Sequence, residues 1–209
     1  MKHLATYIAS VTLLLCGAAS AQEFQHFSAS LGAGFTTPVG TAGSSLDNGW
    51  NIDGAVGVNF AAPVGVMLDL GYNRLGIDNS VLNGLGFGSG GLHIFSATLD
   101  PIIHLNPHGH LDLYVIGGGG IYHQFEQVMQ PSGISVMPNN TFLGFSPSPV
   151  PVQEVATSYS VNKPGIDAGM GIALGTKWHG KIFAEARWNR IFMRYTHTDY
   201  IPVTFGFRW

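Results

Sequence analysis

The sequence predicts an all-β fold, an eight-stranded antiparallel up-and-down transmembrane β-barrel, and three observations predict it. Eight segments alternate between apolar residues and small or polar residues, and a period of two is the pattern of a β-strand. The segments run about ten residues, the length that a tilted strand needs to cross a bilayer. The connections between them are alternately long and short, as in a barrel that has short turns at one end and long loops at the other.

The last ten residues show the alternation most clearly. An apolar face with an aromatic final residue would be an aggregation-prone edge in water. The same pattern is compatible with a membrane strand whose apolar face contacts lipid and whose pairing closes a barrel. The two faces are Ile201, Val203, Phe205, Phe207 and Trp209 against Tyr200, Pro202, Thr204, Gly206 and Arg208.

Seven further strands are expected before this one, with tight turns after the second, fourth and sixth. Long connections rich in Gly, Ser, Thr, Asn or Pro follow the other strands. The predicted strands cover 26–35, 50–60, 65–75, 93–102, 111–123, 166–176, 181–191 and 200–209, and the predicted long connections cover 36–49, 76–92, 124–164 and 192–199.

The direction of the apolar face follows from composition. Charged residues make up only 10% of the chain, against about 25% in ordinary soluble domains. A soluble sandwich or lipocalin-like barrel has the same period of two with its apolar face inward. The outward orientation is favoured because the opposite set is mostly Gly, Ser, Asp and Asn, which fit the narrow lumen of eight strands.

The first 21 residues have the organisation of a secretory signal peptide. A charged start is followed by an apolar run and by small residues at Ala19 and Ala21, where cleavage is expected. Lipidation of Cys16, the only cysteine, is the less favoured alternative. Cleavage leaves one β-barrel domain at 22–209, without cysteine and beyond the inner membrane of a bacterium. The net charge of −3 gives no reason to expect a nucleic-acid partner.

These features together resemble the small bacterial outer-membrane β-barrel proteins, the OmpA/OmpX-like eight-stranded group. The resemblance rests on the signal peptide, the eight-strand pattern, the stretch from Ala184 to Trp188 and the chain end, and it covers 22–209. It implies the outer membrane of a Gram-negative-type bacterium and outer-membrane lipid as surroundings. It also implies that the barrel-assembly machinery recognises Phe205, Phe207 and Trp209. Because functions in this group are diverse, the fold alone does not decide the activity.

Charged residues on the predicted lumen face form the main candidate site. Glu185 and Arg187 lie two apart on one strand, and Arg208 lies on the neighbouring strand, so Glu185 can pair with either arginine. Such a set can be a plug of ion pairs that fills the interior, which we favour, or the lining of a small ion path. Four aspartates point the same way: Asp53, Asp69, Asp112 and Asp167.

No metal site, cofactor or catalytic centre is expected. His104, His108 and His110 crowd one turn and could hold zinc or copper, but a solvated turn is favoured. The glycines from Gly117 to Gly120 lack the Gly-Lys-Ser/Thr that completes a phosphate loop.

Enzymatic activity is not expected either. Lipid A deacylase barrels carry a His-x-Ser motif with a distant Glu, and the stretch 196–199 lacks that serine. No serine and histidine are expected to share a face elsewhere.

Three functions follow as hypotheses. The favoured one is a structural or surface-interaction barrel that displays four outer loops. Loop 124–164 is either a site for an extracellular ligand, since long surface loops carry binding, or a mobile cap over the outer mouth. Residues 152–161 are alternatively an extension of the strand 166–176 above the membrane. The alternatives are a narrow passive pore and, less favoured, a lipid-modifying outer-membrane enzyme.

Overall fold

The computed structural model describes residues 26–85, 87–107, 109–141, 144–176 and 180–209. The predicted signal peptide, with Ala19 and Ala21, lies outside these residues. In the described ranges no helix is long and apolar enough to cross a bilayer.

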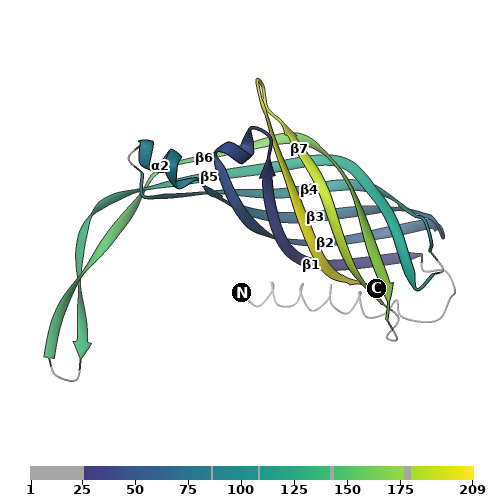
Figure 1. Cartoon of the computed structure of the whole chain (residues 1–209), viewed down its shortest axis with the longest axis horizontal. Coiled ribbons are helices and arrows are strands. Elements are labelled where there is room, and N and C mark those ends of the chain that lie inside the picture. The colour runs from purple at the N-terminus through teal and green to yellow at the C-terminus, as the bar shows by residue number, and fades with distance from the viewer. Residues whose placement is uncertain (1–25, 86, 108, 142–143, 177–179) are drawn as a thin grey trace, which may run out of the picture.

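Eight antiparallel strands form a closed barrel in which each strand pairs with its neighbours in chain order and β8 pairs back with β1 (Figure 1). This confirms the predicted fold class. The elements are β1 (Phe27–Val39), η1 (Ala42–Ser44), β2 (Leu46–Ala61), β3 (Val64–Ile77), α2 (Asn79–Leu85), β4 (Ser89–His104), β5 (Leu111–Thr141), β6 (Gly144–Gly175), β7 (Lys181–Phe192) and β8 (His197–Arg208).

The apolar face of the strands points outward, as predicted. Phe35 is 49% exposed and Phe205 is 54% exposed, whereas Thr36 and Thr204 beside them are buried. Because the side-chain period of a strand is two, the closed register holds one alternate set of residues in each strand, the predominantly apolar one, on the outer surface. A large apolar surface of this kind requires a lipid environment.

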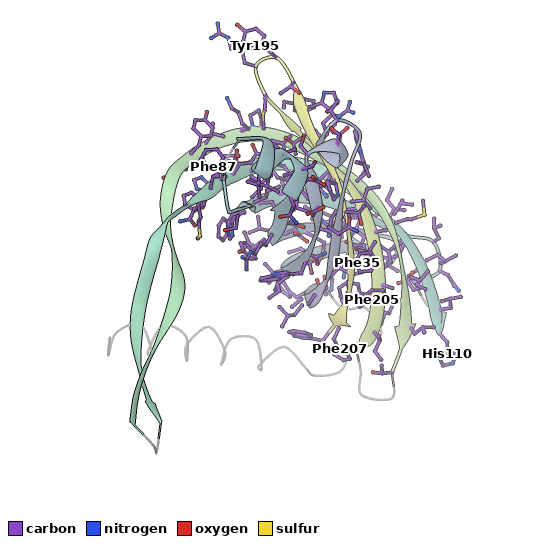
Figure 2. The ribbon with its side chains drawn as sticks, turned by 60° about the vertical axis from the view of Figure 1, so that its left-hand side comes forward. Phe35, Phe87, His110, Tyr195, Phe205 and Phe207 are labelled. Carbon is purple, nitrogen blue, oxygen red and sulfur yellow. The ribbon has the colours of Figure 1, made fainter. Side chains whose placement is uncertain are left out.

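The two ends of the barrel differ in their connections. The turns after β2, β4 and β6 and both barrel termini lie at one end, which we call the short-turn end. The long-connection end carries η1, α2, the β5–β6 hairpin and the β7–β8 connection. Figure 2 shows His110 and Tyr195 at these opposite ends.

The long connections are shorter and more ordered than expected. β1 and β2 reach Val39 and Leu46, so only residues 40–45 remain of the predicted connection 36–49. The predicted connection 76–92 contains the helix α2. The strands extend further because backbone pairing continues beyond the zone where lipid imposes an alternating pattern.

The largest correction concerns 124–164, which is not an irregular loop. β5 and β6 stay paired from Leu111–Leu174 to Thr141–Gly144, with irregularities near Met129 and Pro131. The pair forms a two-stranded ribbon that projects beyond the barrel (Figure 1). The prolines that favour a loop in the sequence are compatible with this ribbon for a geometric reason.

Prolines in the ribbon recur at strand spacing. Pro147, Pro149 and Pro151 are two residues apart, and Pro138 lies opposite Pro147. Alternate N–H groups of a strand point to opposite edges, so these prolines can all occupy positions whose missing N–H would face away from the partner strand. Proline content alone therefore does not exclude a strand here.

We predict that Gly34→Val prevents normal closure of the barrel. A Cβ atom at residue 34 would lie 1.8 Å from the carbonyl oxygen of Val203 on β8, and overpacking of this kind costs about 3 kcal/mol. The folded fraction on unheated gels, where a closed barrel migrates differently from the heated protein, should fall. Ala33→Val, which enlarges an exposed side chain on the lipid face, is the matched control. An unchanged folded fraction for Gly34→Val would contradict the close approach of β1 and β8.

Candidate functional site

The barrel lumen is filled by three layers of side chains. An ionic layer lies in the middle, and an apolar cluster lies toward each end. The cluster near the short-turn end contains Ala55, Met67, Ile102, Tyr114, Ile116, Ala173 and Phe183. The cluster near the long-connection end contains Leu75, Leu92, Ile94, Tyr122, Ile191 and Tyr200.

Arg187 organises the ionic layer. Its Nε donates to Glu185, its Nη1 lies 2.8 Å from Asp100 Oδ2, and its Nη2 lies 2.9 Å from Asp69 Oδ2. Asp167 Oδ1 lies 3.9 Å from Nη1. The guanidinium therefore joins carboxylates of β3, β4, β6 and β7. Because β3 and β7 are four places apart in a ring of eight strands, this one side chain bridges the lumen.

Arg208 lies beside this layer, toward the short-turn end. Its Nη2 lies 3.7 Å from Glu185 Oε2, so Glu185 contacts both arginines that the sequence offered as partners. The Arg208 guanidinium also lies over the rings of Tyr114, at 4.5 Å, and Phe183, at 5.2 Å. These cation–π contacts connect the ionic layer to the adjacent apolar cluster.

The remaining predicted lumen residues occupy separate positions. Asp112 contacts Lys181 Nζ at 2.8 Å and His104 Nδ1 at 2.7 Å near the short-turn end, away from Arg187. Asp53 lines a cavity of about 30 Å³ together with Asp69 and Arg187. Such a cavity has room for about two water molecules.

Sequence reasoning missed several members of the lumen. Asp100 is fully buried and accepts a hydrogen bond from Arg187. Lys181 is the cation that pairs with Asp112. Their positions in alternating strands could have identified them. The two apolar clusters were also missed, because large residues such as Tyr122 and Ile94 interrupt an otherwise small and polar inner face.

Two of the three histidines of the candidate metal turn lie in the part of the chain that the structure describes. His104 contacts Asp112 within the barrel, His110 lies in the turn at the short-turn end (Figure 2), and His108 lies outside the described residues. In the part of the chain that the structure describes, no group of three or more His, Cys, Asp or Glu side chains could hold a metal ion.

A serine–histidine pair corrects the expectation that none shares a face. Ser160 Oγ lies 3.3 Å from His123 Nε2, and His123 Nδ1 lies 2.6 Å from Asn162 Oδ1. The pair was missed because Ser160 and Asn162 lie in 124–164, which was expected to be a loop. The continued pairing of β5 and β6 brings these three residues together on the outer surface.

An ion pair lies at the long-connection end, above the apolar belt. Arg190 donates two hydrogen bonds to Asp199, at 2.9 and 2.7 Å, and its guanidinium lies 4.7 Å from the centre of the Trp188 ring. The hydrogen bonds from Arg190 lower the pKa of Asp199 below its ordinary value of 3.8.

Comparisons with known proteins agree with this architecture. A family model for the outer membrane protein beta-barrel domain matches residues 7–207, and no curated protein sequence matches the chain.

Two solved structures illustrate the likeness of the fold. The Neisserial surface protein NspA has 14% identity and a TM-score of 0.56 over 88% of this chain and 96% of that chain. A major outer membrane protein of Thermus thermophilus has 11% identity and a TM-score of 0.58 over 88% and 97%.

We predict that Arg187→Leu destabilises the barrel by about 3–5 kcal/mol, because it leaves several buried carboxylates without their cation. Urea unfolding of the lipid-reconstituted protein measures this loss. Lys181→Met is the control, and its effect should be smaller because His104 still contacts Asp112. An Arg187→Leu variant as stable as the wild type would contradict the bridging role.

A second prediction concerns the pH dependence of the Arg190–Asp199 pair. Because the folded-state pKa of Asp199 is lowered, the pair stabilises the protein above about pH 4. This contribution is lost as the pH falls through the lowered pKa and Asp199 becomes protonated. The difference in unfolding free energy between wild type and Asp199→Asn should therefore shrink below about pH 4. A constant difference down to the most acidic pH would argue against the pair.

Proposed function

The chain belongs to the family of outer membrane protein beta-barrel domains, and on this premise we propose that it is a non-conducting scaffold with a structural or surface-interaction role. It lies in the outer membrane. With the arrangement usual for such barrels, the short-turn end faces the periplasm and the long-connection end faces the exterior.

The filled lumen is the observation that supports a scaffold. Arg187 bridges the interior, and an apolar cluster lies on each side of the ionic layer. An ion that crossed would have to disrupt buried ion pairs and pass two dehydrated layers, both of which are costly. A barrel closed in this way is suited to holding its connections in place rather than to transport.

The outer connections are where a surface interaction would take place. η1, α2 and the β5–β6 ribbon all lie at the long-connection end. Residues 130–157 of the ribbon contain a single charged residue, Glu154, so a partner bound there would be recognised mainly by contacts other than ion pairs. We propose this ribbon as the site for an extracellular ligand.

A narrow cation pore is the second candidate. One observation favours it: lumen carboxylates outnumber the lumen cations Lys181, Arg187 and Arg208. If the apolar clusters opened, the excess negative charge would favour cations over anions. The carboxylates are Asp53, Asp69, Asp100, Asp112, Asp167 and Glu185.

Single-channel recording in planar bilayers separates the two candidates. We expect the folded wild-type protein to give no discrete current steps, because the lumen is filled. Heat-modifiable gel migration of the same sample controls for folding. Regular current steps with cation selectivity would contradict the scaffold proposal and support the cation pore.

A further inference from the structure

The outer surface of the barrel carries a serine, a histidine and an asparagine in one hydrogen-bonded chain. We propose that Ser160, His123 and Asn162 form a hydrolase centre that cleaves acyl esters of lipids in the outer leaflet. This goes beyond the scaffold role, and it differs from the expectation of no enzymatic activity. That expectation rested in part on the absence of a serine–histidine pair.

Strand pairing explains why these three residues meet. His123 on β5 lies directly opposite Asn162 on β6, and Ser160 is two residues from Asn162. Residues two apart on a strand share a face, and diagonal cross-strand neighbours lie within reach of long side chains.

The type of pairing also brings the side chains close. Pro164, which has no N–H, lies opposite Ile121, which indicates a non-hydrogen-bonded pair. Two residues further along, the His123–Asn162 pair is then of the same type. In such pairs the facing side chains approach each other most closely.

The hydrogen bonds give the histidine the tautomer that a general base needs. The Nδ1–H of His123 donates to Asn162 Oδ1 at 2.6 Å, which leaves the lone pair on Nε2. Nε2 lies 3.3 Å from Ser160 Oγ and can accept its proton. An oriented imidazole beside a hydroxyl is the arrangement that activates a serine nucleophile.

The surroundings fit a lipid substrate. Ser160 and Asn162 are exposed and His123 is partly exposed, on the face that carries the lipid-facing residues. Ile121, which is 63% exposed, and Phe95, whose ring centre lies 6.3 Å from that of His123, provide apolar surface for acyl chains. The centre lies toward the long-connection end, where the polar groups of the outer leaflet and water meet the barrel.

The neighbouring backbone can serve the developing oxyanion. β7 pairs with β6 only from the Gly165–Ile191 pair onward. Beyond it, toward Ser160, one edge of β6 has no strand partner within the described residues. Alternate backbone N–H groups on such an edge are unpaired donors, the kind of group that stabilises a tetrahedral oxyanion.

The proposed reaction has two balanced steps. Ser160 Oγ attacks the ester carbonyl carbon while its proton passes to His123 Nε2. The ester C–O bond breaks, the leaving alcohol takes that proton, and an acyl-serine forms. Water then attacks the acyl carbon, gives a proton to His123 and releases the fatty acid, and the proton returns to Ser160. Asn162 is a positioning residue, since it acts only through the imidazole.

Labelling with an alkyl fluorophosphonate tests the nucleophile directly. The reagent bonds to an activated serine oxygen and releases fluoride. With the protein folded in detergent, we expect one adduct, located on Ser160 by mass spectrometry and absent from Ser160→Ala. Ser158→Ala is the matched control, because Ser158 is an exposed serine on the same face two residues away, and its labelling should equal that of the wild type.

Lipid hydrolysis tests the activity and its substrate. Fatty acid release is measured from mixed vesicles of phosphatidylethanolamine and phosphatidylglycerol and, separately, from lipid A, so that the two arms identify the lipid class. His123→Gln should lower release by about 10²–10⁴-fold, the usual loss for a general base. Asn162→Ala should also lower it, and Asn162→Asp should restore it, which a merely structural hydrogen bond would not do.

Three outcomes would overturn the proposal: an unlabelled wild-type protein, a label that persists in Ser160→Ala, or fatty acid release that Ser160→Ala leaves unchanged. Heat-modifiable migration of each variant shows that it is folded. The scaffold proposal is tested separately by conductance, so failure of one does not decide the other.

Discussion

Pairing of every backbone group inside the hydrocarbon is the constraint on which this structure depends. A strand in lipid cannot leave N–H and C=O groups unpaired, because each one costs several kcal/mol. The pairing of β1 with β8, from Ser30–Arg208 to Val39–Asp199, removes the last free edges. Closure then fixes which residues face lipid and which face the lumen, since a shift of one residue would exchange the two faces.

The lumen follows from that closure. Eight strands enclose a lumen just wide enough for side chains, so a buried charge there needs a partner of opposite charge from another strand. Arg187 meets this demand by contacting carboxylates from both sides of the barrel. The apolar clusters around Tyr114 and Tyr122 separate this ionic layer from water at each end. The same packing that stabilises the interior supports a closed scaffold.

Beyond the hydrocarbon, backbone groups can pair with water, so neighbouring strands need not end at the same height. β5 and β6 continue as a pair beyond the strands beside them. Their continuation places Ser160 and Asn162 next to His123 at the outer edge of the barrel. The candidate catalytic centre and the protruding ribbon therefore have one origin, the extension of a single hairpin past the end of β7.

Local alternation was sufficient to predict the barrel from sequence. Segments such as 181–191 and 200–209 each show one apolar face, and charge-poor composition indicated that this face meets lipid. The inward position of Glu185, Arg187 and Arg208 followed from the same parity. These features are predictable because each depends only on residues two apart along a strand.

The tertiary structure decided what depends on partners far apart in sequence. The contacts of Arg187 with Asp69 and Asp100 join residues separated by 118 and 87 positions, and no local pattern specifies such a pairing. The same holds for 124–164. Its prolines indicated a loop, but pairing between β5 and β6 continues through this segment as two strands. The Ser160–His123 contact depends on that register, so only the folded barrel reveals it.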